Sequence, residues 1–227
     1  MHFVLTVFYR TPAASGLTQE KKMLQTLKSG VIIMIPIILC GVIATYIIVN
    51  RLIYFASTKK RDKSLLQNVL AFMKNNDFDS CVRLCREAET PVANIILKAI
   101  QGRDLQEKDL REVVETQMDL EVPSYEHLLT TLGTIANIAT LLGLLGTVTG
   151  NIKAFGVLGA GGTMGDPALL AGAIAEALVT TVAGLCVSIP SLIFHNFFVS
   201  QVNHKIVEMQ TVATQVIFKI LGKSNSL

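Results

Sequence analysis

The sequence predicts an all-α membrane protein with three transmembrane helices and a small helical domain between the first two. The chain has 227 residues, of which 51% are hydrophobic and only 16% are charged, whereas soluble domains carry about 25% charged residues. Three long stretches, residues 31–49, 128–157 and 168–200, contain almost no charged side chains. Each is about long enough to cross a bilayer as a helix. The charged residues are concentrated between the first two stretches.

The first span is predicted over residues 30–56, after an N-terminal arm over residues 1–29. Residues 19–29 have lysines on one side and leucines on the other, which is typical of a helix lying in the membrane interface. The uncharged run of residues 31–49 then ends at an Asn-Arg pair. Pro36, near the start of this run, is expected to kink the helix.

Residues 57–126 form the polar region, and we expect several short helices there because the apolar residues recur with helical spacing. Asp77 can cap a helix that starts after the Asn-Asn pair of residues 75–76. Thr90 and Pro91 have the residue types preferred at the N-cap and at the first helical position. A further helix is expected to start near Asp104.

The second and third spans are predicted over residues 127–158 and 168–200, joined by a short Gly-rich loop over residues 159–167. Both apolar stretches exceed the roughly 20 residues that a bilayer requires, so we expect them to extend into the cytoplasm. A C-terminal cytoplasmic helix is predicted over residues 201–227. The basic cluster after the first span favours a cytoplasmic polar domain, which leaves the N-terminal arm in the periplasm.

Glu176 is the most informative residue because it is the one acidic residue in the third apolar stretch. A carboxylate at bilayer depth costs about 2.5–3.5 kcal/mol on insertion scales, and such residues usually face a bundle interior or an ion path. Glu176 therefore needs a partner, a proton or water. Movement of protons or cations is the leading hypothesis.

Small and hydroxyl-bearing residues form one face of each later span. At 100° per residue, Thr140, Gly143, Thr147 and Gly150 share a face of the second span, and Gly172, Glu176, Thr180 and Ala183 share a face of the third. Such stripes also allow helices to pack closely in membranes, so packing and pore lining both remain open. We expect a role in pore lining or helix packing for six small residues of these two spans: Gly143, Gly146, Gly150, Gly172, Ala183 and Gly184. Three helices leave no room for a hydrated path, so the sequence predicts a homo-oligomer.

Two stretches carry a family resemblance. Residues 135–150 read IANIATLLGLLGTVTG and residues 175–190 read AEALVTTVAGLCVSIP. With these stretches the chain resembles the MotA/TolQ/ExbB family of proton-channel subunits, and most of all its ExbB branch.

The resemblance implies a pentameric ring in the inner membrane of a Gram-negative bacterium, with protons as the transported ion and no cofactor. The ring would enclose two helices of an ExbD-like partner, a single-span protein with a transmembrane Asp. The complex would drive a TonB-like protein and so energise outer-membrane uptake. The family's acidic residue matches Glu176, and its pore-facing threonines match Thr147 and Thr181. On an ideal helix Thr181 lies about 140° from Glu176, so Thr180 is the better geometric candidate.

Two departures and three alternatives accompany this hypothesis. Thr140 stands where the family usually has Pro, and Lys153 adds a cation near the periplasmic end of the second span, where it affects proton access. A TolQ-like subunit of an envelope-maintenance system is one alternative, and a proton-coupled secondary transporter is another. The third is a membrane scaffold in which Glu176 pairs with a basic residue of a partner.

Enzymes and nucleic-acid-binding proteins fit the sequence poorly. We find no nucleophile with a nearby base and no phosphate-binding loop. Cys81 and Cys85 lie one helical turn apart, but they lack the further ligands of a metal site and are expected to be buried helix positions. A net charge of +3 is too small to indicate nucleic-acid binding.

Overall fold

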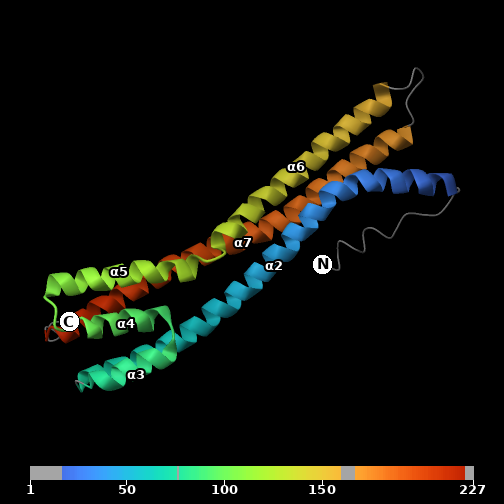
Figure 1. The fold of residues 1–227 in the computed structure, drawn as a ribbon. Helices are drawn as coiled ribbons and strands as arrows, with labels where there is room; N and C mark the ends of the chain where they lie inside the picture. Colours follow the sequence, from blue (N-terminus) through green and yellow to red (C-terminus); the bar gives the residue numbers. More distant parts are fainter. Residues whose placement is uncertain (1–16, 76, 160–166, 223–227) are drawn as a thin grey trace. The chain divides into compact units, whose positions relative to one another are not determined.

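The computed structural model describes residues 17–75, 77–159 and 167–222, and its regular secondary structure there is entirely helical (Figure 1). The predicted all-α fold is thus confirmed for the described chain. The helices have the following bounds: α2 Leu17–Lys74, α3 Phe78–Ala88, α4 Pro91–Gln101, α5 Glu107–Glu126, α6 Leu129–Gly159 and α7 Pro167–Ile220. Three helical stretches are long and apolar enough to cross a membrane: Ile32–Lys74, Glu107–Gly156 and Pro167–Ile220.

The short helices start where the sequence places their caps. Asp77 is the N-cap of α3, and its carboxylate accepts a hydrogen bond of 3.1 Å from the Ser80 amide. Thr90 is the N-cap of α4, with Pro91 at the first helical position. These caps satisfy amides that have no partner within the helix, which is why they set the starting points.

Helix α5 begins at Glu107, slightly later than the expected start near Asp104. Pro123 lies in its last turn and does not prevent helix formation up to Glu126. The chain then turns at Leu128, whose φ of 66° lies in the left-handed region. Because a non-glycine residue rarely adopts this conformation, the turn separates α5 from α6 as two distinct helices.

The long helices run without a break through segments that the sequence analysis distinguishes. Helix α2 covers the interfacial segment, the first span and the start of the polar region. Helix α7 covers the third span and most of the tail predicted over residues 201–227. Helix α6 continues to Gly159 and α7 begins at Pro167, so the first and last residues of the predicted loop over residues 159–167 are helical. The rest of that loop, residues 160–166, lies outside the described residues, as does the arm up to residue 16.

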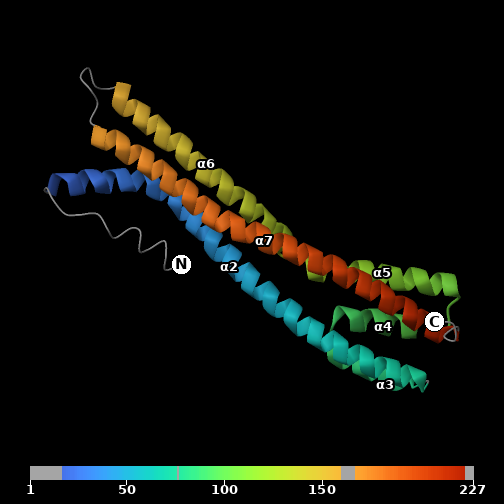
Figure 2. The ribbon, with the colours of Figure 1, turned by 180° about the vertical axis from the view of Figure 1, so that it is seen from behind.

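The chain divides into two compact units, which we describe separately. Unit 1 comprises Met1–Leu39 and Ala139–Cys186, and unit 2 comprises Cys40–Ile138 and Val187–Leu227. Within unit 1, the segments of α6 and α7 lie side by side in both views (Figures 1 and 2). Within unit 2, α3, α4 and α5 pack with segments of α2 and α7.

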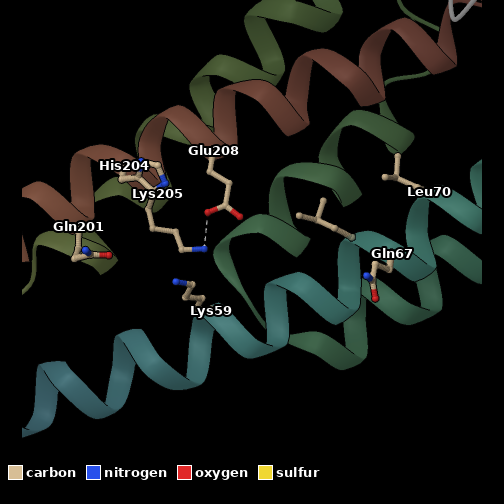
Figure 3. Close-up of a pocket in the computed structure, with 8 residues that line it drawn as sticks. Lys59, Gln67, Leu70, Gln201, His204, Lys205 and Glu208 are labelled. Carbon is tan, nitrogen blue, oxygen red and sulfur yellow. Dashed lines mark ion pairs between the residues drawn. The ribbon is translucent and has the colours of Figure 1, made fainter. Parts of the chain in front are cut away.

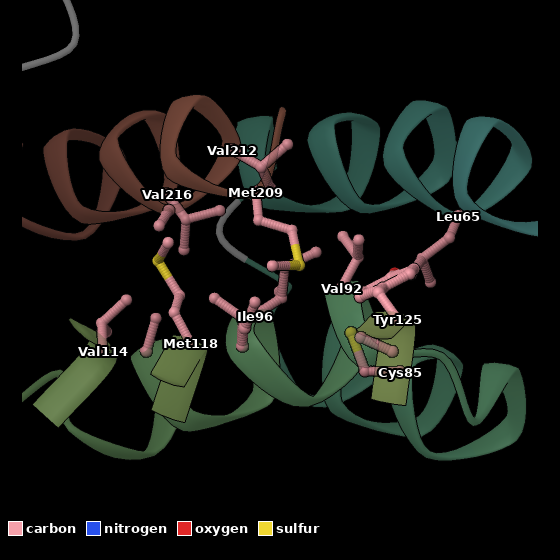
Figure 4. Close-up of a cluster of buried hydrophobic side chains, with 14 of the residues drawn as sticks. Leu65, Cys85, Val92, Ile96, Val114, Met118, Tyr125, Met209, Val212 and Val216 are labelled. Carbon is pink, nitrogen blue, oxygen red and sulfur yellow. The ribbon is translucent and has the colours of Figure 1, made fainter. Parts of the chain in front are cut away.

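Unit 2 holds a core of large hydrophobic side chains. Leu65 of α2, Ile96 of α4, Val114 of α5 and Met209 of α7 are all at most 3% exposed. Figure 4 shows that side chains from these helices converge in one cluster. Burial of this much apolar surface is the main stabilising contribution available to a small helical domain.

Aromatic rings and one arginine join three helices in unit 2. Phe55 of α2 stacks on Phe198 of α7 with ring centroids 5.8 Å apart, and Tyr54 meets Tyr125 of α5 edge to face at 6.1 Å. Arg51 is only 3% exposed. Its guanidinium donates a hydrogen bond to the backbone carbonyl of His127 and lies 5.2 Å from the Tyr54 ring centroid. The arginine thereby satisfies a carbonyl at the end of α5, where the helix leaves backbone acceptors unpaired.

Candidate functional site

The candidate site lies in unit 1, along the seam between α6 and α7. The buried residues of both helices follow the same spacing of four, three and four positions. Over residues 139–150 of α6 they are Ala139, Gly143, Gly146 and Gly150, and over residues 173–184 of α7 they are Ala173, Ala177, Thr180 and Gly184. This is the 3.5-residue repeat of supercoiled helices. We call these eight residues the small-residue seam.

The seam brings two backbones into close contact. A Cβ atom built on Gly184 would lie 2.6 Å from the Ala139 carbonyl oxygen and 3.0 Å from the Cα atom of Gly143. A Cβ on Gly146 would lie 2.6 Å from the Cβ of Thr180. Distances below 3.0 Å require a shift of the neighbouring atoms, so no larger residue fits without change. Small residues at such positions allow the van der Waals packing that holds membrane helices together.

Glu176 forms an ion pair with Lys153 across this helix pair. The Lys153 Nζ and Glu176 Oε1 atoms are 2.9 Å apart. The Glu176 side chain is 16% exposed and that of Lys153 is 35% exposed. The second carboxylate oxygen, Oε2, is buried and has no hydrogen-bond partner among the described residues. Glu176, expected to need a partner, therefore has a basic partner within its own chain.

Two of the predicted threonines lie at the seam. Thr180 is 3% exposed, and its hydroxyl donates to the Ala177 carbonyl at 2.8 Å. The Thr181 hydroxyl donates across the seam to the Gly143 carbonyl at 2.9 Å. Both threonines therefore contribute to α6–α7 packing in the single chain, and Thr181 directly links the helices.

The two threonines of α6 that were predicted as site residues are more accessible. Thr147 is half-buried, and its hydroxyl donates to the Leu144 carbonyl at 2.6 Å. Thr140 is exposed. The structure thus brings Thr180 and Thr181 to the seam but does not place Thr140 there.

The remaining stripe residues divide in the same way. Gly143, Gly146, Gly150 and Gly184 line the seam, and Ala183 is half-buried. Gly172 is exposed, and a Cβ built on it would meet no atom within 4 Å. Gly172 therefore takes no part in the packing between α6 and α7, unlike the four seam glycines.

Sequence reasoning missed three members of the seam, Ala139, Ala173 and Ala177. Ala177 is 3% exposed, and its Cβ faces Gly150. A projection at 100° per residue describes a straight helix, whereas two packed helices follow a 3.5-residue repeat. The signal was present in the sequence as small residues spaced four, three and four apart.

Unit 2 contains a second charged group that the sequence analysis did not identify. Lys205 Nζ lies 3.1 Å from Asp62 Oδ2 and 2.8 Å from Glu208 Oε2, and the Asp62 side chain is fully buried. Burial alone lowers the pKa of Lys205, but hydrogen bonds to Glu208 and Asp62 outweigh this effect and raise it above the usual value. A sequence signal existed, since Asp62 is the one acidic residue in the basic run of residues 59–63.

A pocket of about 360 Å³ adjoins this charged group, between α2 and α7. In Figure 3, Lys59 reaches from α2 toward Lys205, whose ammonium is paired with Glu208. His204 and Gln201 belong to the same pocket. The pocket belongs to the charged group of unit 2, whereas the Glu176 pair belongs to unit 1.

Cys81 and Cys85, one helical turn apart on α3, are free cysteines in the core of unit 2. Cys81 and Cys85 are 0% and 2% exposed, as expected for buried helix positions. Burial raises the pKa of Cys85 to about 12, so its thiol stays protonated and is a poor metal ligand. Among the described residues no cluster of three or more His, Cys, Asp or Glu side chains is spaced to hold a metal ion.

Comparison with known proteins gives a consistent set of similarities. The family model of the MotA/TolQ/ExbB proton channel family matches residues 87–211. A Synechocystis protein named biopolymer transport protein ExbB-like 3 is 31% identical over 75% of this chain and 81% of its own length. The biopolymer transport protein ExbB of Neisseria meningitidis is 26% identical over 73% of this chain and 80% of its own. The Tol-Pal system protein TolQ of Haemophilus influenzae is 33% identical over 42% of each chain.

Proposed function

The chain belongs to the MotA/TolQ/ExbB proton channel family, and from this premise we propose that it is the ExbB-like subunit of an energy-transducing complex. Family membership makes it a multi-pass membrane protein of a proton channel and not an enzyme. In the proposal it assembles as a homopentamer in the inner membrane of a Gram-negative bacterium, with its N-terminus in the periplasm. An ExbD-like partner and a TonB-like protein complete the complex, which uses the proton-motive force to energise outer-membrane uptake.

The observation that carries the proposal is the Lys153–Glu176 ion pair on two apolar helices. Charged side chains within membrane spans are rare, usually face the bundle interior or a hydrated cavity, and mark ion and proton paths. Glu176 lies about 14 Å along α7 from the start at Pro167, at 1.5 Å per residue. This depth supports a role within the membrane and not at its surface.

The exposed faces of unit 1 support assembly with other chains. Leu141, Ile152 and Phe155 of α6 and Leu178 and Val182 of α7 are between 57% and 71% exposed. The small residues that the two helices share are already used in the seam. A hydrated path in this proposal therefore forms between copies, or between the copies and the partner's helices.

The mechanism follows from the charges. A proton enters from the periplasm near residues 156–167, passes the half-buried threonines Thr147 and Thr181, and neutralises the partner's Asp. The neutral Asp is attracted less to hydroxyl groups, so the partner helix can move. Each charge that crosses 100 mV supplies about 2.3 kcal/mol, which is enough to bias a helix contact.

Replacement of Glu176 tests the function directly. In a bacterial strain that lacks its own ExbB, we expect this chain, expressed with an ExbD-like partner, to support TonB-dependent uptake. Glu176→Ala should abolish uptake while native mass spectrometry still finds the assembled complex. Glu115→Ala removes an exposed acid of α5 and should leave uptake unchanged. Normal uptake by Glu176→Ala would contradict the role assigned to this carboxylate.

Thr147→Val tests the hydroxyl path with an almost isosteric change. The valine removes the hydroxyl that donates to the Leu144 carbonyl and leaves the packing volume nearly the same. We expect partial loss of uptake at normal assembly. Uptake at the level of the unmodified chain would show that Thr147 has only a packing role.

A TolQ-like role is the second candidate, because the matched family includes TolQ and the Haemophilus influenzae TolQ is 33% identical over part of the chain. In this case the subunit serves envelope maintenance. Expression in a strain without TolQ distinguishes the two roles. Restored resistance to detergent, without restored uptake in the strain lacking ExbB, would favour the TolQ-like function.

A further inference from the structure

Lys153 gives the proton path a fixed counter-ion. We propose that Lys153 is the counter-ion of Glu176 within the membrane and orients its carboxylate, so that Oε1 is occupied and Oε2 keeps the capacity for a further hydrogen bond. This inference deepens the proposed function and rests on it. Lys153 is thus a positioning residue, acting on the path through Glu176.

The isolation of the pair is the first argument. Among the side chains described in unit 1, residues 32–39, 139–156 and 167–186, Lys153 and Glu176 are the only charged ones. No other described charge of unit 1 competes for either partner. A carboxyl in apolar surroundings favours its protonated form, whereas an opposite charge at hydrogen-bond distance favours the carboxylate. Lys153 is therefore the one described charge of unit 1 that can act as a counter-ion to Glu176.

The geometry of the carboxylate is the second argument. Oε1 accepts from the Lys153 ammonium at 2.9 Å, whereas Oε2 is buried and has no partner among the described residues. A carboxylate accepts several hydrogen bonds, so Oε2 has capacity for a further donor.

The Lys153 side chain is anchored only partly. It is 35% exposed, about twice as much as the Glu176 side chain. Lys153 is therefore the more accessible partner of the ion pair, and Glu176 is the more buried one.

Carbodiimide labelling tests the charge of Glu176 without any transport. Dicyclohexylcarbodiimide reacts with protonated carboxyl groups in apolar surroundings, and mass spectrometry of the full-length chain in lipid nanodiscs measures the labelled fraction at Glu176. We expect low labelling of the unmodified chain. Lys153→Met should raise it roughly tenfold or more, the effect on a carboxyl of removing an adjacent opposite charge. Lys153→Arg should restore the low value, and Glu176→Gln gives the background.

Equal labelling of the unmodified chain and a folded, assembled Lys153→Met variant would overturn the inference. If Lys153→Met does not assemble, the charge exchange Lys153→Glu with Glu176→Lys takes its place. Assembly of the exchanged variant with a poorly labelled carboxyl supports the inference, and failure to assemble or strong labelling overturns it. Labelling does not require uptake, so the two proposals can fail separately. If Lys153→Met leaves the labelling of Glu176 unchanged while Glu176→Ala abolishes uptake, only the counter-ion inference is rejected. If Lys153→Met raises the labelling while Glu176→Ala leaves uptake normal, only the proposed function is rejected.

Discussion

Helix α7 packs with the same spacing in both units, but its buried residues are small in unit 1 and mostly larger in unit 2. In unit 1 its buried positions are Ala173, Ala177, Thr180 and Gly184. In unit 2 the buried positions include Phe198, Val202, Lys205, Met209, Val212 and Val216, again spaced four and three apart, together with Ser188 and Ser191 before them and with Ala213 and Ile217. The comparison shows that the repeat determines which face is buried, and residue size determines how closely the neighbouring helix approaches.

In the proposed topology, the difference in size reflects the surroundings of unit 1, which lies within the membrane, and of the part of unit 2 that lies beyond the membrane. Lipid is as apolar as a leucine side chain, so large hydrophobic residues gain little from burial between membrane helices and close backbone contact dominates. Outside the membrane, burial of large side chains away from water is the main stabilising effect. Unit 1 accordingly exposes leucines such as Leu141 and Leu178 and buries glycine and alanine at the seam, whereas the core of unit 2 is built from large side chains such as Ile96 and Met209.

The largest expected effect is at Lys205, the charged residue within the unit 2 repeat. Lys205→Met removes the counter-ion of the fully buried Asp62 and should lower the free energy of unfolding by about 3–5 kcal/mol. The double variant Lys205→Met with Asp62→Asn should recover much of this loss, because position 62 no longer carries a buried unpaired charge and Glu208, which also loses Lys205, is 36% exposed. Unfolding in detergent followed by circular dichroism measures both.

The raised pKa of Lys205 fixes the pH dependence of the same contribution. The charged lysine stabilises the folded state fully at pH values below the pKa of an unfolded lysine, about 10.4. The contribution is lost as the pH rises through the higher pKa of the folded state. If the single variant Lys205→Met were as stable as the unmodified chain, the Lys205–Asp62 ion pair would have no structural role.

The next largest effect contrasts one large residue from each unit. Ile96→Ala in unit 2 removes a side chain that is 0% exposed and should cost about 2–5 kcal/mol. Leu141→Ala in unit 1 changes a side chain that is 63% exposed and should stay within about 0.5 kcal/mol for the solubilised chain. Equal losses would remove the distinction between the units.

A smaller effect is expected when the small-residue seam is overfilled. Gly146→Val places atoms against Thr180 and should cost about 1–3 kcal/mol. Gly172→Val is the matched control, because a Cβ at this position of α7 meets no atom within 4 Å. Thermal denaturation in detergent should show a lower midpoint for Gly146→Val than for Gly172→Val. Similar midpoints would argue against close packing at the seam.

The smallest effect concerns the Cys85 thiol of unit 2, and its test requires no substitution. With a pKa of about 12, about one Cys85 in ten thousand is a thiolate at pH 8. We expect no maleimide labelling of Cys85 in the folded chain and full labelling after denaturation, measured by mass spectrometry. Rapid labelling of the native chain would mean that the helical core of unit 2 opens readily.

Local sequence patterns were sufficient for much of this protein. The long apolar stretches predicted the membrane helices, since the number of residues needed to cross a bilayer depends only on its thickness. Asp77 and Thr90 predicted helix starts, because an N-cap acts on amides within the next turn. Glu176 was recognisable without a structure because a lone acid in an apolar stretch is costly.

Contacts between distant residues required the folded chain. Lys153 and Glu176 are 23 residues apart, and no local rule pairs them. The seam followed a 3.5-residue repeat because each helix adapts to its neighbour, so the helical projection selected Thr140 and Gly172 instead of Ala139 and Ala177. Residue type and spacing specify the helices, whereas the choice of partners depends on how two helix surfaces meet in space.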